Sequence, residues 1–106
     1  MPDDVNDEWL DRMRSEIGED AVGEVIALFL EETRDAAARL PSLDRRGRRD
    51  MLHFLTGSAA NLGFEGLGAD ARAAMADGRT ARSEAMSALA ARFADACDVL
   101  EARAAA

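Results

Sequence analysis

The segment HFLTGSAANLGF, residues 53–64, holds the only histidine of the chain, followed four residues later by a glycine. Apolar residues in and just before this segment recur at helical spacing; they are Met51, Leu52, Leu55, Ala59 and Leu62. A helical wheel with roughly 100° per residue places His53 opposite the centre of that stripe. The pattern therefore predicts one amphipathic helix, from about Asp44 or Arg48 to Leu62, that buries the stripe and exposes the histidine.

Helical spacing continues on both sides of this segment. Upstream, apolar residues from Val22 to Leu40 form one stripe, with Asp20 as a candidate N-cap and Pro41 as the stop. Downstream, a shorter helix is expected over about 65–76, and a longer one from about 80 or 81 to 104. Turns are expected at two glycine-containing segments, GFEGLG (63–68) and DGRT (77–80).

Four such helices with short connections predict an all-α fold, namely an up-and-down antiparallel four-helix bundle. A short additional N-terminal helix around Trp9 is expected to end near Gly18 and to cap one end of the bundle. No internal repeat or long linker divides the chain. We therefore expect one domain over residues 1–106, with its bundle core over about 9–104.

The composition narrows the classes of partner and site. A net charge of −8 disfavours binding to nucleic acid or to an anionic membrane. No apolar run approaches the roughly 18 residues that cross a bilayer, and the acidic N-terminus does not resemble a signal peptide, so we expect a cytoplasmic protein. One histidine and one cysteine make a metal site unexpected. Cys97 falls on the apolar stripe of the last helix and is expected to be buried.

The exposed face around His53 is predicted to carry very small side chains. Gly57 and Ala60 follow the histidine on that face, so the imidazole would stand in a clearing. Glycine costs about 1 kcal/mol in a helix interior relative to alanine, and a ring that must meet another protein's reactive group would offset that cost. Arg49 and Thr56 are expected to offer hydrogen-bond donors to an anion on the ring. A dimer seam, or an ordinary surface histidine, remains an alternative reading of the same face.

Further residues are expected to contact a partner. Phe54 and Phe64 would flank the clearing as apolar surface, with Asn61 nearby. The segment DRRGRRD, residues 44–50, is the one dense basic cluster. It is either an ordinary solvated helix start or a patch that steers an acidic protein surface toward the histidine. The residues of such a patch would be Arg45, Arg46 and Arg48.

The segment HFLTGSAANLG resembles the signature of histidine-containing phosphotransfer (HPt) domains, usually His-x-Leu-Lys-Gly-Ser-x-x-x-x-Gly. The matching residues are His53, Leu55, Gly57, Ser58 and Gly63. The upstream segment VIALFLEETRDAAARL is also similar to the helix that precedes the histidine helix in that family. The resemblance thus covers most of the chain, from about residue 9 to 104. One position departs from the pattern, because Thr56 stands where the family commonly has lysine and all 13 basic residues here are arginines.

The resemblance implies a phosphoryl carrier in a two-component phosphorelay. His53 would accept a phosphoryl group from an aspartate of a receiver domain and pass it to another receiver, so the chain would have no enzymatic turnover of its own. Expected partners are response-regulator receiver domains and a hybrid or sensor histidine kinase. The receiver would bring Mg²⁺, so this chain would need no cofactor and is expected to be a monomer.

Two questions follow from the departure at Thr56. Arg49, one turn before His53, is expected to supply the charge that the family's lysine would provide. The alternative function is a non-transferring module that docks and sequesters a receiver domain or kinase through the same face.

Overall fold

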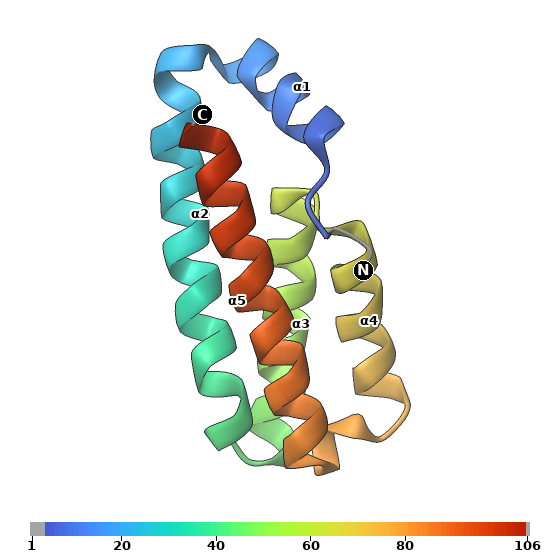
Figure 1. Ribbon diagram of the computed structural model, residues 1–106. Helices are drawn as coiled ribbons and strands as arrows, with labels where there is room; N and C mark the ends of the chain where they lie inside the picture. Colours follow the sequence, from blue (N-terminus) through green and yellow to red (C-terminus); the bar gives the residue numbers. More distant parts are fainter. Residues whose placement is uncertain (1–3, 106) are drawn as a thin grey trace.

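The computed structural model describes residues 4–105, and every element that it describes is a helix (Figure 1). The all-α class predicted from the periodicity is confirmed. The five α-helices are α1 (Asp7–Ile17), α2 (Glu19–Arg39), α3 (Arg45–Leu62), α4 (Glu65–Ala76) and α5 (Ser83–Ala105). Two short 3₁₀ turns, η1 (Leu40–Ser42) and η2 (Arg79–Ala81), lie before α3 and α5.

The long helices lie side by side, and α1 crosses near the end where the chain terminates (Figure 1). Helix α3 packs against both α2 and α4, while α2 also packs along α5. Each of these helices turns an apolar stripe inward, which is why the sequence periodicity is helical throughout. The largest fully buried side chains are Ile26, Leu30, Leu40, Leu52, Leu55, Leu62, Phe64, Leu67, Met86, Phe93 and Leu100.

Both ends of α3 are defined by local capping. At its start, the Asp44 carboxylate accepts a hydrogen bond of 2.7 Å from the Gly47 backbone N–H. At its end, Gly63 adopts a left-handed conformation with φ +74°, and the Phe64 N–H donates to the Ala59 carbonyl at 2.8 Å. The helix that carries the only histidine is therefore closed at both ends by the residues expected from the sequence.

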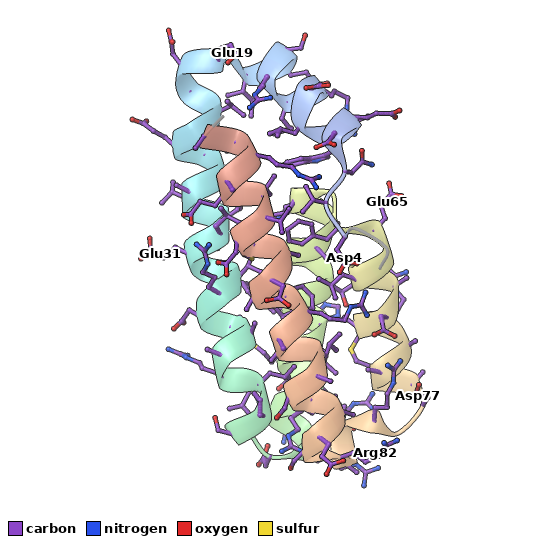
Figure 2. The ribbon with its side chains drawn as sticks, viewed as in Figure 1. Asp4, Glu19, Glu31, Glu65, Asp77 and Arg82 are labelled. Carbon is purple, nitrogen blue, oxygen red and sulfur yellow. The ribbon has the colours of Figure 1, made fainter. Side chains whose placement is uncertain are left out.

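Trp9 of α1 packs directly on the end of α3. A Cβ atom at Gly63 would lie only 2.5 Å from Cγ of Trp9, a separation that real Cβ atoms essentially never show. Gly63 is therefore required both by its left-handed backbone and by the ring above it. Charged contacts also hold the N-terminal segment: Arg92 forms ion pairs with Asp4 at 3.0 Å and with Asp70 at 2.9 Å. Asp4 is labelled in Figure 2.

Three boundaries differ from the sequence predictions. Helix α2 begins at Glu19, after Gly18 with φ +103°, so Asp20 is not its N-cap. The chain turns only at Gly63 and Phe64, and the remaining glycines of GFEGLG lie within α4. One of them, Gly68, would place a Cβ 3.1 Å from the Ala59 Cβ, so its role is the close approach of α3 and α4. Helix α5 starts at Ser83, a few residues later than expected.

Two further predictions concern hydrophobicity. Cys97 is fully buried, as expected, and its burial raises the pKa of the thiol to about 11. Among the described residues, no helix combines the length and the apolar character that a membrane crossing requires.

Candidate functional site

His53 lies on the exposed face of α3, as the helical wheel predicts. The opposite face of the same helix is closed, since Leu52, Leu55, Ala59 and Leu62 have no solvent exposure. The histidine is therefore presented to solvent by a helix whose other side is held in the core. A side chain that must meet a group on another protein needs such a fixed position.

The predicted clearing beside the ring is present. A Cβ atom placed on Gly57 would meet nothing within 4 Å, and the small side chain of Ala60 is exposed. Gly57 is thus an interior helix glycine with no packing reason to lack a side chain. This separates it from Gly63 and Gly68, whose missing side chains are explained by Trp9 and Ala59.

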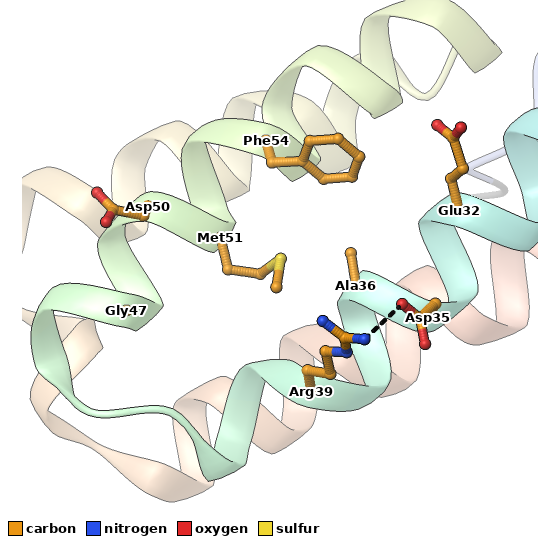
Figure 3. A pocket seen from close by; sticks show the side chains of 8 residues that line it. All are labelled: Glu32, Asp35, Ala36, Arg39, Gly47, Asp50, Met51 and Phe54. Carbon is orange, nitrogen blue, oxygen red and sulfur yellow. Dashed lines mark ion pairs between the residues drawn. The ribbon is translucent and has the colours of Figure 1, made fainter.

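On the α2 side of His53 lies a groove of about 420 Å³ between α2 and α3 (Figure 3). Its apolar surface comes from Ala36, Met51 and Phe54, and the Phe54 ring is 45 % exposed. Glu32 and Asp50 add acidic groups. The other lining residues are Gly47 and the ion pair of Arg39 with Asp35, whose closest atoms are 3.4 Å apart. This groove therefore combines an apolar surface with mainly acidic charged groups.

On the α4 side lies a smaller groove of about 210 Å³ between α3 and α4. Thr56 and Ala60 contribute to it from α3, three and seven residues after the histidine. The Thr56 hydroxyl donates its proton to the Leu52 carbonyl at 2.8 Å, one turn earlier in the same helix. In this arrangement the hydroxyl proton is used within the helix and Thr56 offers an acceptor to the groove; donation to an anion would need the hydroxyl to rotate and stays a prediction.

Arg49 is exposed on the same side, but one of its N–H groups is already used. Its Nη1 donates to the Met75 carbonyl near the end of α4 at 3.4 Å, which holds the guanidinium toward that helix. The donors on its other nitrogens have no partner among residues 4–105. Its role as the substitute for the family's lysine therefore stays a prediction.

Two residues expected to dock a partner are corrected by the structure. Phe64 has no exposed surface, because the left-handed turn at Gly63 directs it into the core instead of along the exposed face of α3. Arg48 is only 9 % exposed and donates to the carbonyls of Thr80 (2.9 Å) and Pro41 (2.6 Å). It therefore joins the start of α3 to the two connecting turns. The remaining expected contacts, Phe54, Asn61, Arg45 and Arg46, are exposed.

Arg72 is a candidate that the sequence did not indicate. It lines the α3–α4 groove from α4, together with Phe64, Glu65, Gly68 and Ala69. The only signal that would find it is the pairing of α3 with α4, which becomes visible where Gly68 meets Ala59. No local motif in the sequence connects residue 72 with the histidine.

Within residues 4–105, no three His, Cys, Asp or Glu side chains gather closely enough to hold a metal ion. Comparison with known proteins identifies no relative: no protein-family model, no curated protein and no solved structure matches the chain. Functional inference therefore depends on the geometry of the His53 face.

Proposed function

We propose that this chain is a histidine phosphotransfer protein of a two-component phosphorelay, with His53 as the phosphoacceptor. The observation that carries the proposal is an exposed, central imidazole on α3 beside Gly57, where an added methyl group would meet nothing within 4 Å. An interior helix glycine with no packing role costs stability. Access for a phosphoryl group and an incoming protein supplies a reason for that cost.

The proposal includes a specific arrangement of the helices. Helices α2, α3, α4 and α5 form an up-and-down antiparallel four-helix bundle, and α1 is the additional helix. Support comes from the short connections between successive helices and from the packing of α3 on both α2 and α4. In such a bundle the middle of one helix face is the most rigid place for a reacting side chain.

The chemistry is a reversible transfer between aspartate and histidine. A ring nitrogen of His53, Nε2 by analogy with HPt domains, forms an N–P bond as the P–O bond to a receiver aspartate breaks. The carboxylate leaves with the electron pair of that bond, and the reverse reaction delivers the group to a second receiver. Phosphoryl transfer depends mainly on positioning and charge neutralisation, so a receiver that carries its own Mg²⁺ needs only an aligned nucleophile from this chain.

The surface around the histidine supports docking of an acidic receiver or of a kinase. Arg45 and Arg46 are exposed on the turns of α3 that lead to the ring, where they would steer an acidic surface. On the other side, Phe54 offers the apolar contact that a stable encounter requires. The proposed partners are response-regulator receiver domains and a hybrid or sensor histidine kinase. We propose that this chain meets them in the cytoplasm as a monomer.

The nucleophile can be tested without knowing the partner. Phosphoramidate, a small phosphoryl donor, should add one acid-labile, base-stable phosphoryl group to the wild-type protein, detected by intact mass and ³¹P NMR. His53→Gln should abolish the addition while keeping the helical circular dichroism signal. Purified receiver domains should then remove the group from the labelled protein. Failure to label wild type, under conditions that label a reference HPt domain, would refute the proposal.

One observation favours the alternative of a sequestering module. The hydroxyl of Thr56, at the position of the family's lysine, already donates within its own helix and adds no positive charge. Stable binding of a receiver without transfer of the phosphoryl group would support that alternative. A mass that rises with concentration in light scattering would instead support the dimer seam.

A further inference from the structure

A phosphoryl group on His53 would bring negative charge that a nearby cation must balance, and several arginines of the chain are already ion-paired. Four ion-paired arginines, together with their partners, are Arg34 (Asp98, Glu101), Arg79 (Asp70, Asp77), Arg92 (Asp4, Asp70) and Arg103 (Asp7). Arg48 is buried, and Arg49 is held toward the Met75 carbonyl. The α3–α4 groove, which Thr56 and Ala60 of the histidine helix line, is the place to look for an available cation.

Arg72 is such a cation. Its side chain makes no hydrogen bond and no ion pair with any residue between 4 and 105. The positions three and four residues away on α4 are Gly68, Ala69, Met75 and Ala76, none of which is acidic. Glu65, two turns earlier on α4, lines the same groove but forms no ion pair with Arg72. All its donors therefore remain available to a ligand in the groove that it lines.

The groove connects Arg72 to the histidine face. Gly68 and Ala59 bring α4 and α3 into close approach, with a Cβ-to-Cβ separation of 3.1 Å for an added Cβ at Gly68. Arg72 lies one helical turn after that contact, on the wall opposite Thr56. Thr56 is in turn one helical turn from His53 on the exposed face. The small side chains of Ala60 and Ala69 leave the space between the two walls open.

We propose that this α3–α4 groove is the binding site for the oxygens of the phosphoryl group on His53, with Arg72 as a cation that, in addition to Arg49, supplies the charge of the absent lysine. The inference rests on the proposed function. A guanidinium suits the task because its fork of N–H groups can meet two phosphoryl oxygens at once. The cation thus reaches the site from the neighbouring helix, whereas the family's lysine lies on the histidine helix itself.

The test compares wild type, Arg72→Gln, Arg72→Lys and a matched control, Arg82→Gln. Arg82 is also exposed, but it lies at the connection between α4 and α5, near Asp77 (Figure 2). Each protein is treated with phosphoramidate. A ring nitrogen of His53 forms the N–P bond as the P–N bond of the reagent breaks, and ammonia leaves with the electron pair. The rate of labelling is measured by intact mass, and the phosphohistidine is titrated by ³¹P NMR.

Arg72→Gln should slow labelling about tenfold, the loss of one charge-assisted contact to the transferring group. Its ³¹P resonance should also titrate at higher pH than wild type, because the guanidinium stabilises the doubly charged phosphoryl group. Arg72→Lys should bring both the labelling rate and the pH of the ³¹P titration most of the way back to the wild-type values. Arg82→Gln should match wild type in both. A purely structural role for Arg72 would not move the phosphoryl titration in this direction.

Two failures are distinguishable. If wild type forms phosphohistidine while Arg72→Gln labels and titrates like wild type, the role of Arg72 is refuted and the proposed function stands. If wild type does not form phosphohistidine, the proposed function itself fails, and the inference about Arg72 fails with it.

Discussion

Replacing Gly57 with alanine should stabilise the fold and slow phosphoryl transfer at the same time. The position is exposed, lies inside α3, and leaves an added Cβ with nothing within 4 Å, so the substitution creates no clash. Glycine costs about 0.8–1.0 kcal/mol relative to alanine in a helix interior. The free energy of unfolding should therefore rise by about that amount, as measured by urea denaturation followed by circular dichroism.

Gly23 provides the matched control. It is also exposed, lies inside α2, and leaves an added Cβ with nothing within 4 Å. Its side of α2 borders a groove with the end of α5, away from the histidine helix. Gly23→Ala should therefore give the same gain in stability and leave the chemistry of His53 unchanged.

The two variants are then compared in phosphoryl transfer to a receiver domain. We expect Gly57→Ala to slow transfer about tenfold or more, equivalent to about 1.4 kcal/mol in the barrier, because the methyl group lies one turn from the reacting ring. Equal transfer rates for the two variants would refute the idea that the clearing serves the reaction. Equal rates together with equal stabilisation would leave Gly57 without a functional explanation.

Three further predictions test the interpretation of the fold. Gly63→Ala should lower the free energy of unfolding by about 2–4 kcal/mol, because the added methyl group meets Trp9 and the backbone is left-handed. In a Trp9→Ala background, where only the cost of the left-handed backbone remains, the loss should be about 1–2 kcal/mol. An equal loss in both backgrounds would contradict the packing argument. Arg48→Ala should lower the free energy of unfolding by about 3 kcal/mol, whereas Arg46→Ala, at an exposed position, should lower it by about 0.5 kcal/mol or less. Similar losses for the two variants in chemical denaturation would contradict a structural role for Arg48. The free energy of unfolding should fall as pH rises from 9.0 to about 11, because the unfolded chain loses the Cys97 proton in this range while the buried thiol keeps it. The chain has no lysine or tyrosine to titrate there, so Cys97→Ala should flatten the dependence of stability on pH.

The sequence was most informative wherever a pattern is local. The expected bounds of α4 coincide with Glu65–Ala76, and α3 begins at Arg45, directly after Asp44, within the range expected for its start. The exposure of His53 followed from periodicity alone, because a stripe of large apolar residues indicates which helix face is buried. Asp20 failed as a cap because Gly18, two residues earlier, already provides the break from which α2 starts.

The errors arose where the chain reverses or where distant segments meet. Continuing the helical wheel past Gly63 predicts an exposed Phe64, but the left-handed backbone at Gly63 ends the regular rotation and Phe64 is buried. The sequence pattern places Arg48 in a surface patch because its partners are not local: Pro41 and Thr80 lie in the two connecting turns, and Ser83 begins α5, 35 residues away. Arg72 carries no sequence signal of its own, since its importance depends on which helix packs beside α3.

The contact between Trp9 and Gly63 gives the protein an optical reporter of its own. Trp9 is the only tryptophan and the chain has no tyrosine, so the long-wavelength fluorescence comes from one ring at one place. That ring is buried against the last turn of the helix that presents His53. Its emission will therefore follow the seating of α1 on α3, and binding or unfolding that disturbs this end can be followed in unlabelled protein.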